Sequence, residues 1–405
     1  MIDDRFKIIT FYYPSKIIGG AELLFLRLAI NLSRSAEIVV QYVDFPDGFV
    51  AKEIENNQYN ISIIPFDFDR RIMLGEDSLL VAPLSSIFQV SRVFNKNVHV
   101  MLWSIHPMGL KDTIDSLPSY ISSLPYHRYG VDLTKFIAKN GVFFMDRPNF
   151  NIQKEIFAIG QSQVDYLPIF SSVLGRHKQY GSNDSGELRL GWLGRLCIEK
   201  VNPLVNVIAH CNAYLLSNPK ENIVFSIIGD GDKRFMIEDL ELHPNLELKF
   251  LGTLSGERLH NLMIEDIDLM FAMGTSALEA GLLHIATVLV DLSFKDMAAN
   301  NRFRFLYESE GYSVADEYDE ENNYAHELDT ILGRVKSGEI SLDADKCYEY
   351  SLSHHSEESA VKKFCAVTSK IELQLSAVNQ SHFGKYRQLF FLKSIYFKLR
   401  RWFGI

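Results

Sequence analysis

The second half of the chain contains two segments in which glycine and charged or hydroxyl side chains follow a short apolar run. In the first, Gly194-Arg195 follows the run at 188–193, and Lys200 comes five residues after Arg195. An arginine fork and a lysine point charge at the end of a strand can together neutralise a diphosphate. A solvated surface pair is the alternative that these residues leave open.

The second segment, 273–280, reads Met-Gly-Thr-Ser-Ala-Leu-Glu-Ala. Gly274 turns the chain after an apolar run, and Thr275 or Ser276 can cap a helix whose free N–H groups face a phosphate. Glu279 then falls about one turn into this helix, where its carboxylate can accept hydrogen bonds from two ribose hydroxyls. Because its flanks are nearly all apolar, a partner is expected for this carboxylate. An ordinary solvent-facing glutamate is the alternative.

Gly19-Gly20 follows the strand-like run at 7–13 and opens a helical pattern. Glycines there let the backbone approach a ligand, and the free N–H groups at a helix start attract anions. The G-x-G-x-x-G spacing of a dinucleotide-binding turn is absent, which disfavours an NAD enzyme.

Gly229 and His106 also follow strand-like runs. Gly229 begins Gly-Asp-Gly-Asp. For Asp230 and Asp232, a tight turn before a helix near Lys233 is the favoured interpretation. His106 stands in Trp-Ser-Ile-His-Pro, where its imidazole can bond a sugar hydroxyl or an acceptor. A satisfied surface histidine is the alternative there.

Metal-ligand spacing is not convincing anywhere in the chain. Asp67 and Asp69 lie two residues apart, but Arg70 and Arg71 follow directly and favour a solvated loop. The four cysteines are widely spaced, as in a cytoplasmic protein with reduced structural thiols. We therefore expect no metal and no other cofactor.

Short β-branched or aromatic runs alternate with helical patterns through both halves. Strand-like runs occupy 7–13, 37–45, 61–64, 79–82, 98–103, 142–145, 188–193, 223–228, 246–251, 267–273 and 285–290, and helical patterns occupy 20–32, 203–216, 255–263 and 275–283. A polar stretch at 171–186 separates the halves. This α/β pattern predicts two Rossmann-like, doubly wound domains that face a central cleft, at 1–180 and 187–370, followed by a helical tail at 371–405. Ligands of such sheets bind beyond the C-terminal ends of the strands.

The composition excludes several functions. A formal net charge of −10 over 405 residues argues against nucleic-acid binding. The start of the chain lacks the order of a signal peptide, and the most apolar stretch, 269–290, is interrupted by Glu279 and His284. A cytoplasmic protein is therefore expected.

The tail at 381–405 differs from the acidic body, because it holds six lysines or arginines and no acidic residue. As a helix it would gather its apolar side chains, Trp402 among them, on one face. Such a helix can dock on the inner face of an anionic plasma membrane, where a lipid-linked acceptor would reside. Packing of this stripe against the first domain is the alternative.

Taken together, these segments resemble the retaining GT-B glycosyltransferases (glycosyl transferases group 1) of bacterial lipopolysaccharide, capsule and exopolysaccharide assembly. The resemblance covers about residues 6–290. It rests on Tyr13-Pro14 before Gly19-Gly20-Ala21-Glu22, Leu193-Gly194-Arg195-Leu196 with Glu199-Lys200, Ile228-Gly229-Asp230-Gly231, Phe250-Leu251-Gly252, and Asp268 leading to Glu279-Ala280.

The resemblance implies a nucleotide-sugar donor and a glycan or lipid-linked acceptor. Gly19 and Gly20 would lie against the donor diphosphate, Arg195 and Lys200 would neutralise it, and Glu279 would hold the ribose. The other implied donor-side positions are Gly229, Gly274, Thr275 and Ser276. His106 looks like the acceptor-side histidine of the family, and a metal is not expected. Sugar transfer would retain the anomeric configuration, with the leaving phosphate taking the acceptor proton.

One departure concerns the pair of glutamates that the family usually carries. Phe271 occupies the position of the first, eight residues before Glu279, and the segment between Asp268 and Glu279 is short. Since that glutamate normally touches the sugar, two alternatives to a transferase stay open. One is a catalytically silent homologue that acts as partner or scaffold of an active transferase, and the other is a sugar-nucleotide epimerase of the same fold.

Overall fold

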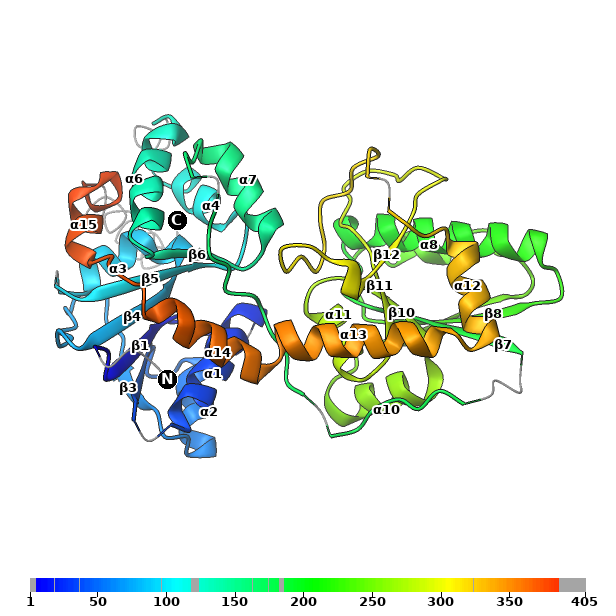
Figure 1. Cartoon of the computed structure of the whole chain (residues 1–405), viewed down its shortest axis with the longest axis horizontal. Helices are drawn as coiled ribbons and strands as arrows, with labels where there is room; N and C mark the ends of the chain where they lie inside the picture. The colour runs from blue at the N-terminus through cyan, green and yellow to red at the C-terminus, as the bar shows by residue number, and fades with distance from the viewer. Residues whose placement is uncertain are drawn as a thin grey trace, which may run out of the picture. The chain divides into compact units, whose positions relative to one another are not determined.

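The computed structural model describes residues 5–385 apart from 18, 36, 96, 118–123, 162, 174, 182–185 and 323. The chain folds into two compact units (Figure 1). The first combines the chain up to Ile169 with a C-terminal segment that starts at Glu357, and the second spans Phe170–Ser356.

The first unit is built on a six-stranded sheet in the order β3-β2-β1-β4-β5-β6, in which every pairing is parallel. Its strands are β1 Ile8–Tyr12, β2 Val39–Asp44, β3 Ser62–Pro65, β4 Ser78–Pro83, β5 His99–Ser104 and β6 Val142–Phe144. Its helices are α1 Gly20–Ser33, α2 Phe49–Asn57, α3 Ile87–Val93, α4 Gly109–Asp115, α6 Tyr126–Ala138, α7 Arg147–Phe157, α14 Glu357–Thr368 and α15 Leu375–Gln380. In Figure 1, α1 and α14 cover one face of this sheet and α6 and α7 the other. Since both faces are covered, all six residues of β4 are buried.

The second unit repeats this arrangement in the order β12-β11-β10-β7-β8-β9, with only the short β12 antiparallel among its described strands. Its strands are β7 Glu187–Leu193, β8 Asn222–Ile228, β9 Leu246–Gly252, β10 Leu269–Ala272, β11 Ala286–Leu289 and β12 Arg304–Phe305. Its helices are α8 Ile198–Ser217, α9 Phe235–Glu238, α10 Gly256–Asp266, α11 Thr275–Leu282, α12 Leu328–Ser337 and α13 Ile340–His355. Figure 1 shows α8 and α10 on opposite sides of the sheet. The predicted pair of doubly wound α/β domains is thereby confirmed.

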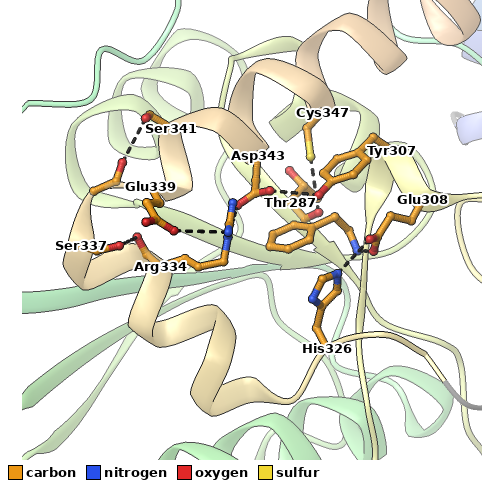
Figure 2. A network of polar contacts seen from close by, with 12 residues as sticks. Thr287, Tyr307, Glu308, His326, Arg334, Ser337, Glu339, Ser341, Asp343 and Cys347 are labelled. Atoms are coloured by element: carbon orange, nitrogen blue, oxygen red, sulfur yellow. Dashed lines mark hydrogen bonds and ion pairs between the residues drawn. The ribbon is translucent and has the colours of Figure 1, made fainter.

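A polar network ties the last helices of the second unit to its sheet (Figure 2). Arg334 on α12 donates from Nε to Asp343 Oδ2 on α13 at 2.7 Å, and the hydroxyl of Tyr307 donates to Asp343 Oδ1 at 2.9 Å. The thiol of Cys347 donates to the carbonyl of Thr287 on β11, with 3.6 Å between sulfur and oxygen. Asp343 is buried, so these bonds stabilise the fold.

The division into units differs from the expected one at both ends of the second unit. Residues 170–180 lie with the second unit, where Lys178 and the hydroxyl of Tyr180 bind Asp268 at the start of β10, at 3.1 and 2.9 Å. Residues 357–370 lie with the first unit, where Phe364 of α14 is fully buried. The chain thus returns to the first unit earlier than residue 371, because its apolar residues are buried there.

The beginning of the predicted tail packs on the first unit. The backbone N–H of His382 donates to Asp132 Oδ2 at 2.8 Å, and His382 Nδ1 lies 2.8 Å from the same oxygen. The ring of Phe383 is fully buried beside Phe88 and Tyr129. The predicted amphipathic helix falls mainly on 386–405, which lie outside the described residues. Within the part of the chain that the structure describes, no helix is long and apolar enough to span a bilayer.

Candidate functional site

The strand order of the second unit brings the two most specific sequence segments together. β7 pairs in parallel with both β8 and β10. The chain adds β8 and β9 on one side of β7 and then returns to add β10 on the other side, so the switch point of the sheet lies between β7 and β10. The register places Leu193 beside Ala272, and Arg195 and Gly274 each follow two residues later. The C-terminal side of such a switch point is where doubly wound sheets bind ligands.

Arg195 and Lys200 lie at this edge as cations that no carboxylate of the described residues compensates. Arg195 is exposed and Lys200 half-buried, and neither side chain makes a hydrogen bond or ion pair with any residue that the structure describes. Helix α8 begins at Ile198, which places Lys200 in its first turn. A cation there is opposed by the positive end of the helix dipole, at a cost of roughly 0.3–1 kcal/mol. A bound anion would remove this repulsion.

The start of α8 differs from the predicted start at Pro203, which lies inside the helix. Proline lacks the N–H that would bond the carbonyl four residues earlier, which is that of Glu199. The freed Glu199 carbonyl accepts instead from the backbone N–H of Ser293, at 2.9 Å. The proline is therefore accommodated, and it connects the first turn of α8 to the loop after β11.

The residue before this helix, Cys197, donates its thiol to Glu199 Oε1 at 2.9 Å. Burial and the neighbouring Glu199 carboxylate raise the pKa of this thiol, so it stays a neutral donor. The contact leaves the Glu199 carboxylate engaged within its own turn rather than paired with Lys200.

Position 229, at the end of β8, requires glycine for structural reasons. Its φ is +135°, and a Cβ there would lie 2.0 Å from the carbonyl oxygen of Gly194. The two loops are joined by backbone bonds, from Gly194 N to Ile228 O and from Leu196 N to Asp230 O, both at 3.0 Å. Glycine is thus required for close contact between the loops, and this contact holds the backbone next to Arg195.

Gly274 itself is the N-cap residue of α11, with φ +64°, and no side chain caps the helix. The prediction that Thr275 or Ser276 would be the cap is wrong, because both already lie in the first turn. The left-handed backbone of Gly274 turns the chain directly after β10, so the helix starts one residue earlier than a hydroxyl cap would allow. The backbone N–H groups of Thr275 and Ser276 have no partner among the described residues and remain available to an anion.

Glu279 has the partner that its apolar flanks predicted. Its Oε1 lies 2.7 Å from Nε2 of His260 on α10. The side chains are 28% and 19% exposed, respectively, so the pair is sheltered but accessible to a ligand. Sequence reasoning missed His260, because nothing in the spacing of α10 distinguishes it from a surface histidine.

A buried ion cluster holds the loop that contacts Gly274. The backbone N–H of Gly274 donates to Val314 O at 2.9 Å, and two residues later Asp316 Oδ2 lies 2.7 Å from Arg304 Nη2. The same Nη2 lies 2.9 Å from Asp291 Oδ1, and Asp291 and Arg304 are only 4% and 9% exposed. Burial raises the pKa of Asp291, while Arg304 opposes this shift. The cluster fixes the loop beside the N-terminus of α11.

Phe271 lies inside β10, and its side chain cannot contact a ligand at the end of the strand. Its side chain is fully buried, and its ring stacks on that of Phe225 with 5.9 Å between centroids. Position 271 therefore supplies packing rather than a carboxylate.

The predicted positions of the first unit lie at the C-terminal edge of its own sheet. Gly19 is the N-cap of α1, with an extended backbone, and a Cβ there would lie 2.7 Å from Glu22 Oε2. A Cβ at Gly20 would meet no atom within 4 Å. A side chain at position 19 would therefore displace only the end of the Glu22 side chain, and one at position 20 would meet no obstacle. Burial and the Glu22 carboxylate raise the pKa of nearby Tyr13 to about 12.

His106 lies in the loop between β5 and α4 with an exposed side chain. Its Nδ1 accepts the backbone N–H of Met108 at 3.2 Å. This bond assigns the proton of the neutral ring to Nε2, which is left as a free donor at the strand end.

Asp67 and Asp69 form a turn rather than a ligand cluster. Asp67 Oδ1 accepts the N–H of Asp69 at 3.0 Å. Asp230 Oδ1 likewise accepts the N–H of Gly231 at 2.8 Å. Among the residues that the structure describes, no three His, Cys, Asp or Glu side chains come together as a metal site.

The chain resembles known proteins in its three-dimensional structure. No protein-family model and no curated protein sequence matches the chain. Among solved structures, HepE of Anabaena in complex with UDP and glucose superposes with a TM-score of 0.52 at 14% identity, covering 90% of this chain and 99% of HepE. A glycosyltransferase of Rickettsia africae gives 0.56 at 10% identity, with 90% and 98% covered. The N-terminal domain of Candida albicans trehalose-6-phosphate phosphatase gives 0.52 at 12% identity, with 90% and 96% covered. The chain therefore has the fold of the GT-B glycosyltransferases.

Proposed function

We propose that this protein transfers a sugar from a nucleotide-activated donor to a glycan or lipid-linked acceptor in the synthesis of a bacterial surface polysaccharide. The observation that carries the proposal is the pair of cations at the switch point of the second unit, Arg195 and Lys200, which form no ion pair with any described residue. At the same edge, the first two backbone N–H groups of α8 and of α11 have no partner among the described residues. A nucleoside diphosphate suits this arrangement, and HepE, which shares the fold, holds UDP and glucose.

In the proposed complex, Arg195 and Lys200 neutralise the diphosphate that leaves, and Glu279 accepts hydrogen bonds from the ribose hydroxyls. This stabilisation is what a divalent ion supplies in other transferases, so the reaction proceeds without a metal. The acceptor attacks on the face from which the phosphate departs, the anomeric configuration is retained, and the leaving phosphate takes the acceptor proton. On the acceptor side, His106 Nε2–H donates to a sugar hydroxyl.

The function is tested by incubating the protein with UDP-, GDP- and ADP-sugars, with and without a glycan acceptor extract and with excess EDTA. We expect transfer that depends on the acceptor and persists in EDTA. Turnover without acceptor would instead identify an epimerase, and tight nucleotide binding without turnover a silent homologue. Activity lost on chelation and restored by Mn²⁺ or Mg²⁺ would overturn the metal-free mechanism.

A Glu279→Gln variant is expected to bind the nucleoside diphosphate more weakly while its melting temperature changes little. Glutamine keeps the size but removes the charge that strengthens each bond from a ribose hydroxyl, worth about 1.5–3 kcal/mol. Calorimetry measures the affinity, and Glu257→Gln on the exposed start of α10 is the matched control. Unchanged affinity in Glu279→Gln would make Glu279 a structural residue.

We further propose that residues 386–405 dock the protein on an anionic membrane surface. Truncation after Lys385 keeps His382 and Phe383, which pack on the first unit, and removes the basic-aromatic stretch. The truncated protein should keep its melting temperature and no longer sediment with vesicles of phosphatidylglycerol at low salt. The proposal would be contradicted if the full-length protein did not sediment with these vesicles. It would also be contradicted if truncation lowered the melting temperature substantially.

A further inference from the structure

We infer that His260 is a positioning residue, which holds the Glu279 carboxylate in the orientation that receives the ribose. The inference rests on the proposed function, because it requires a nucleotide at the switch-point edge of the second unit. It assigns a role to a residue of α10 that lies in neither of the two segments singled out by the sequence.

The geometry of the pair supports donation from the imidazole to the carboxylate. His260 lies in the second turn of α10 and Glu279 in the second turn of α11, and the pair joins the two helices through one contact of 2.7 Å. With Nε2 carrying the proton, the ring donates to Oε1 and leaves Oε2 free. The Glu279 side chain has no other hydrogen-bond partner among the described residues, so His260 alone restrains it.

Orientation matters because the two neighbouring hydroxyls of a ribose must be met by one carboxylate plane. A glutamate side chain that is free to rotate loses conformational entropy when it binds, and this loss weakens binding. A glutamate already held by an imidazole has lost that freedom beforehand. Since one oxygen is held on the protein side, the other is presented to the ligand.

A purely structural role explains the pair less well. Both side chains keep some contact with solvent, so loss of the imidazole leaves no fully buried unpaired charge. Helix α10 is anchored instead by Leu259 and Met263, which are 5% and 0% exposed on its inner face. Loss of the imidazole donor should therefore leave the fold intact and act on ribose recognition.

The test compares the affinity of the protein for a ribonucleotide with its affinity for an analogue that lacks both hydroxyls. The probe is whichever of UDP, GDP and ADP binds most tightly to the full-length protein, together with its 2′,3′-dideoxy form, both measured by calorimetry. The variants are His260→Phe, which keeps a ring without a donor, and His260→Gln, whose amide reaches about as far as Nε2. Glu279→Gln is measured beside them.

We expect His260→Phe to reduce the preference for the ribonucleotide by roughly five- to tenfold. Its affinity for the dideoxy form should stay that of the wild type. His260→Gln should retain most of the preference, and a structural residue would not show this rescue. If His260→Phe fails to fold, His260→Asn replaces it, because its shorter amide does not reach the carboxylate.

The outcomes separate this inference from the proposed function. Wild-type preference in the Phe or Asn variant, with reduced preference in Glu279→Gln, overturns the role of His260 and leaves the site as proposed. Wild-type preference in Glu279→Gln as well overturns ribose binding by Glu279. Equal losses for the ribonucleotide and the dideoxy form in the His260 variants would show a general disturbance and also overturn the inference.

Discussion

Replacing Arg195 or Lys200 with alanine is expected to weaken binding of the nucleoside diphosphate by a factor of roughly 30 to 150. Each cation is proposed to make a charge-assisted contact with the diphosphate, and loss of one such contact costs about 2–3 kcal/mol. The fold should be preserved, because neither side chain bonds to a residue that the structure describes. Lys200→Ala should even relieve the repulsion at the start of α8 and raise the melting temperature slightly.

Lys220→Ala provides the matched control for both variants. Lys220 is exposed and precedes β8 at the N-terminal edge of the same sheet, the edge away from the candidate site. This variant makes the same change in net charge, so it measures the general electrostatic effect on an anionic ligand. Donor affinities in Arg195→Ala and Lys200→Ala that equal that of Lys220→Ala would exclude a specific diphosphate site.

Arg304→Leu is expected to lower the free energy of unfolding by about 3–5 kcal/mol. The substitution leaves Asp291 and Asp316 close together without their shared cation, and removal of one partner from a buried ion pair has an effect of this size. It also removes the guanidinium that lies over the ring of Tyr324, with 4.4 Å between Cζ and the centroid. Chemical denaturation measures the change.

The surface pair of Lys295 and Glu320 provides the control for Arg304. The two groups lie 3.5 Å apart at 67% and 62% exposure, so Lys295→Leu should change stability little. A second consequence distinguishes the cluster from an ordinary stabilising contact. Because the loop at Val314 holds Gly274, Arg304→Leu should also weaken nucleotide binding under conditions where the protein remains folded. Equal stability of the two variants would contradict the role given to the buried cluster.

Several features of the protein follow from the amino-acid sequence alone. The run at 79–82 has no polar face, so it must be covered on both sides, and it became the fully buried β4. Repeated alternation of such runs with helical patterns implies parallel sheets, and every described pairing in both sheets is parallel except that of the short β12. The turns at Gly194 and Gly274 could be placed at strand ends because glycine and polar residues directly follow apolar runs.

Where each helix begins was decided partly by contacts far away in the sequence. The proline at 203 suggested a helix start, but α8 begins at Ile198, because the loop at Ser293 satisfies the carbonyl that proline leaves free. At α11, hydroxyl residues suggested a cap, but the left-handed backbone of Gly274 turns the chain one residue earlier. Local propensity could not distinguish these outcomes.

Only the tertiary structure decided which of these segments meet. Hydrophobic periodicity does not encode strand order, so the pairing of β7 with β10, which places Arg195 near Gly274, could not be read from the chain. The contact between His260 and Glu279 could not be predicted from the sequence either, because it joins the helix before β10 to the helix after it. The sequence therefore determined which residues could do the chemistry. The packing of distant elements determined which residues became their neighbours, because side-chain partners depend on three-dimensional register rather than on spacing along the chain.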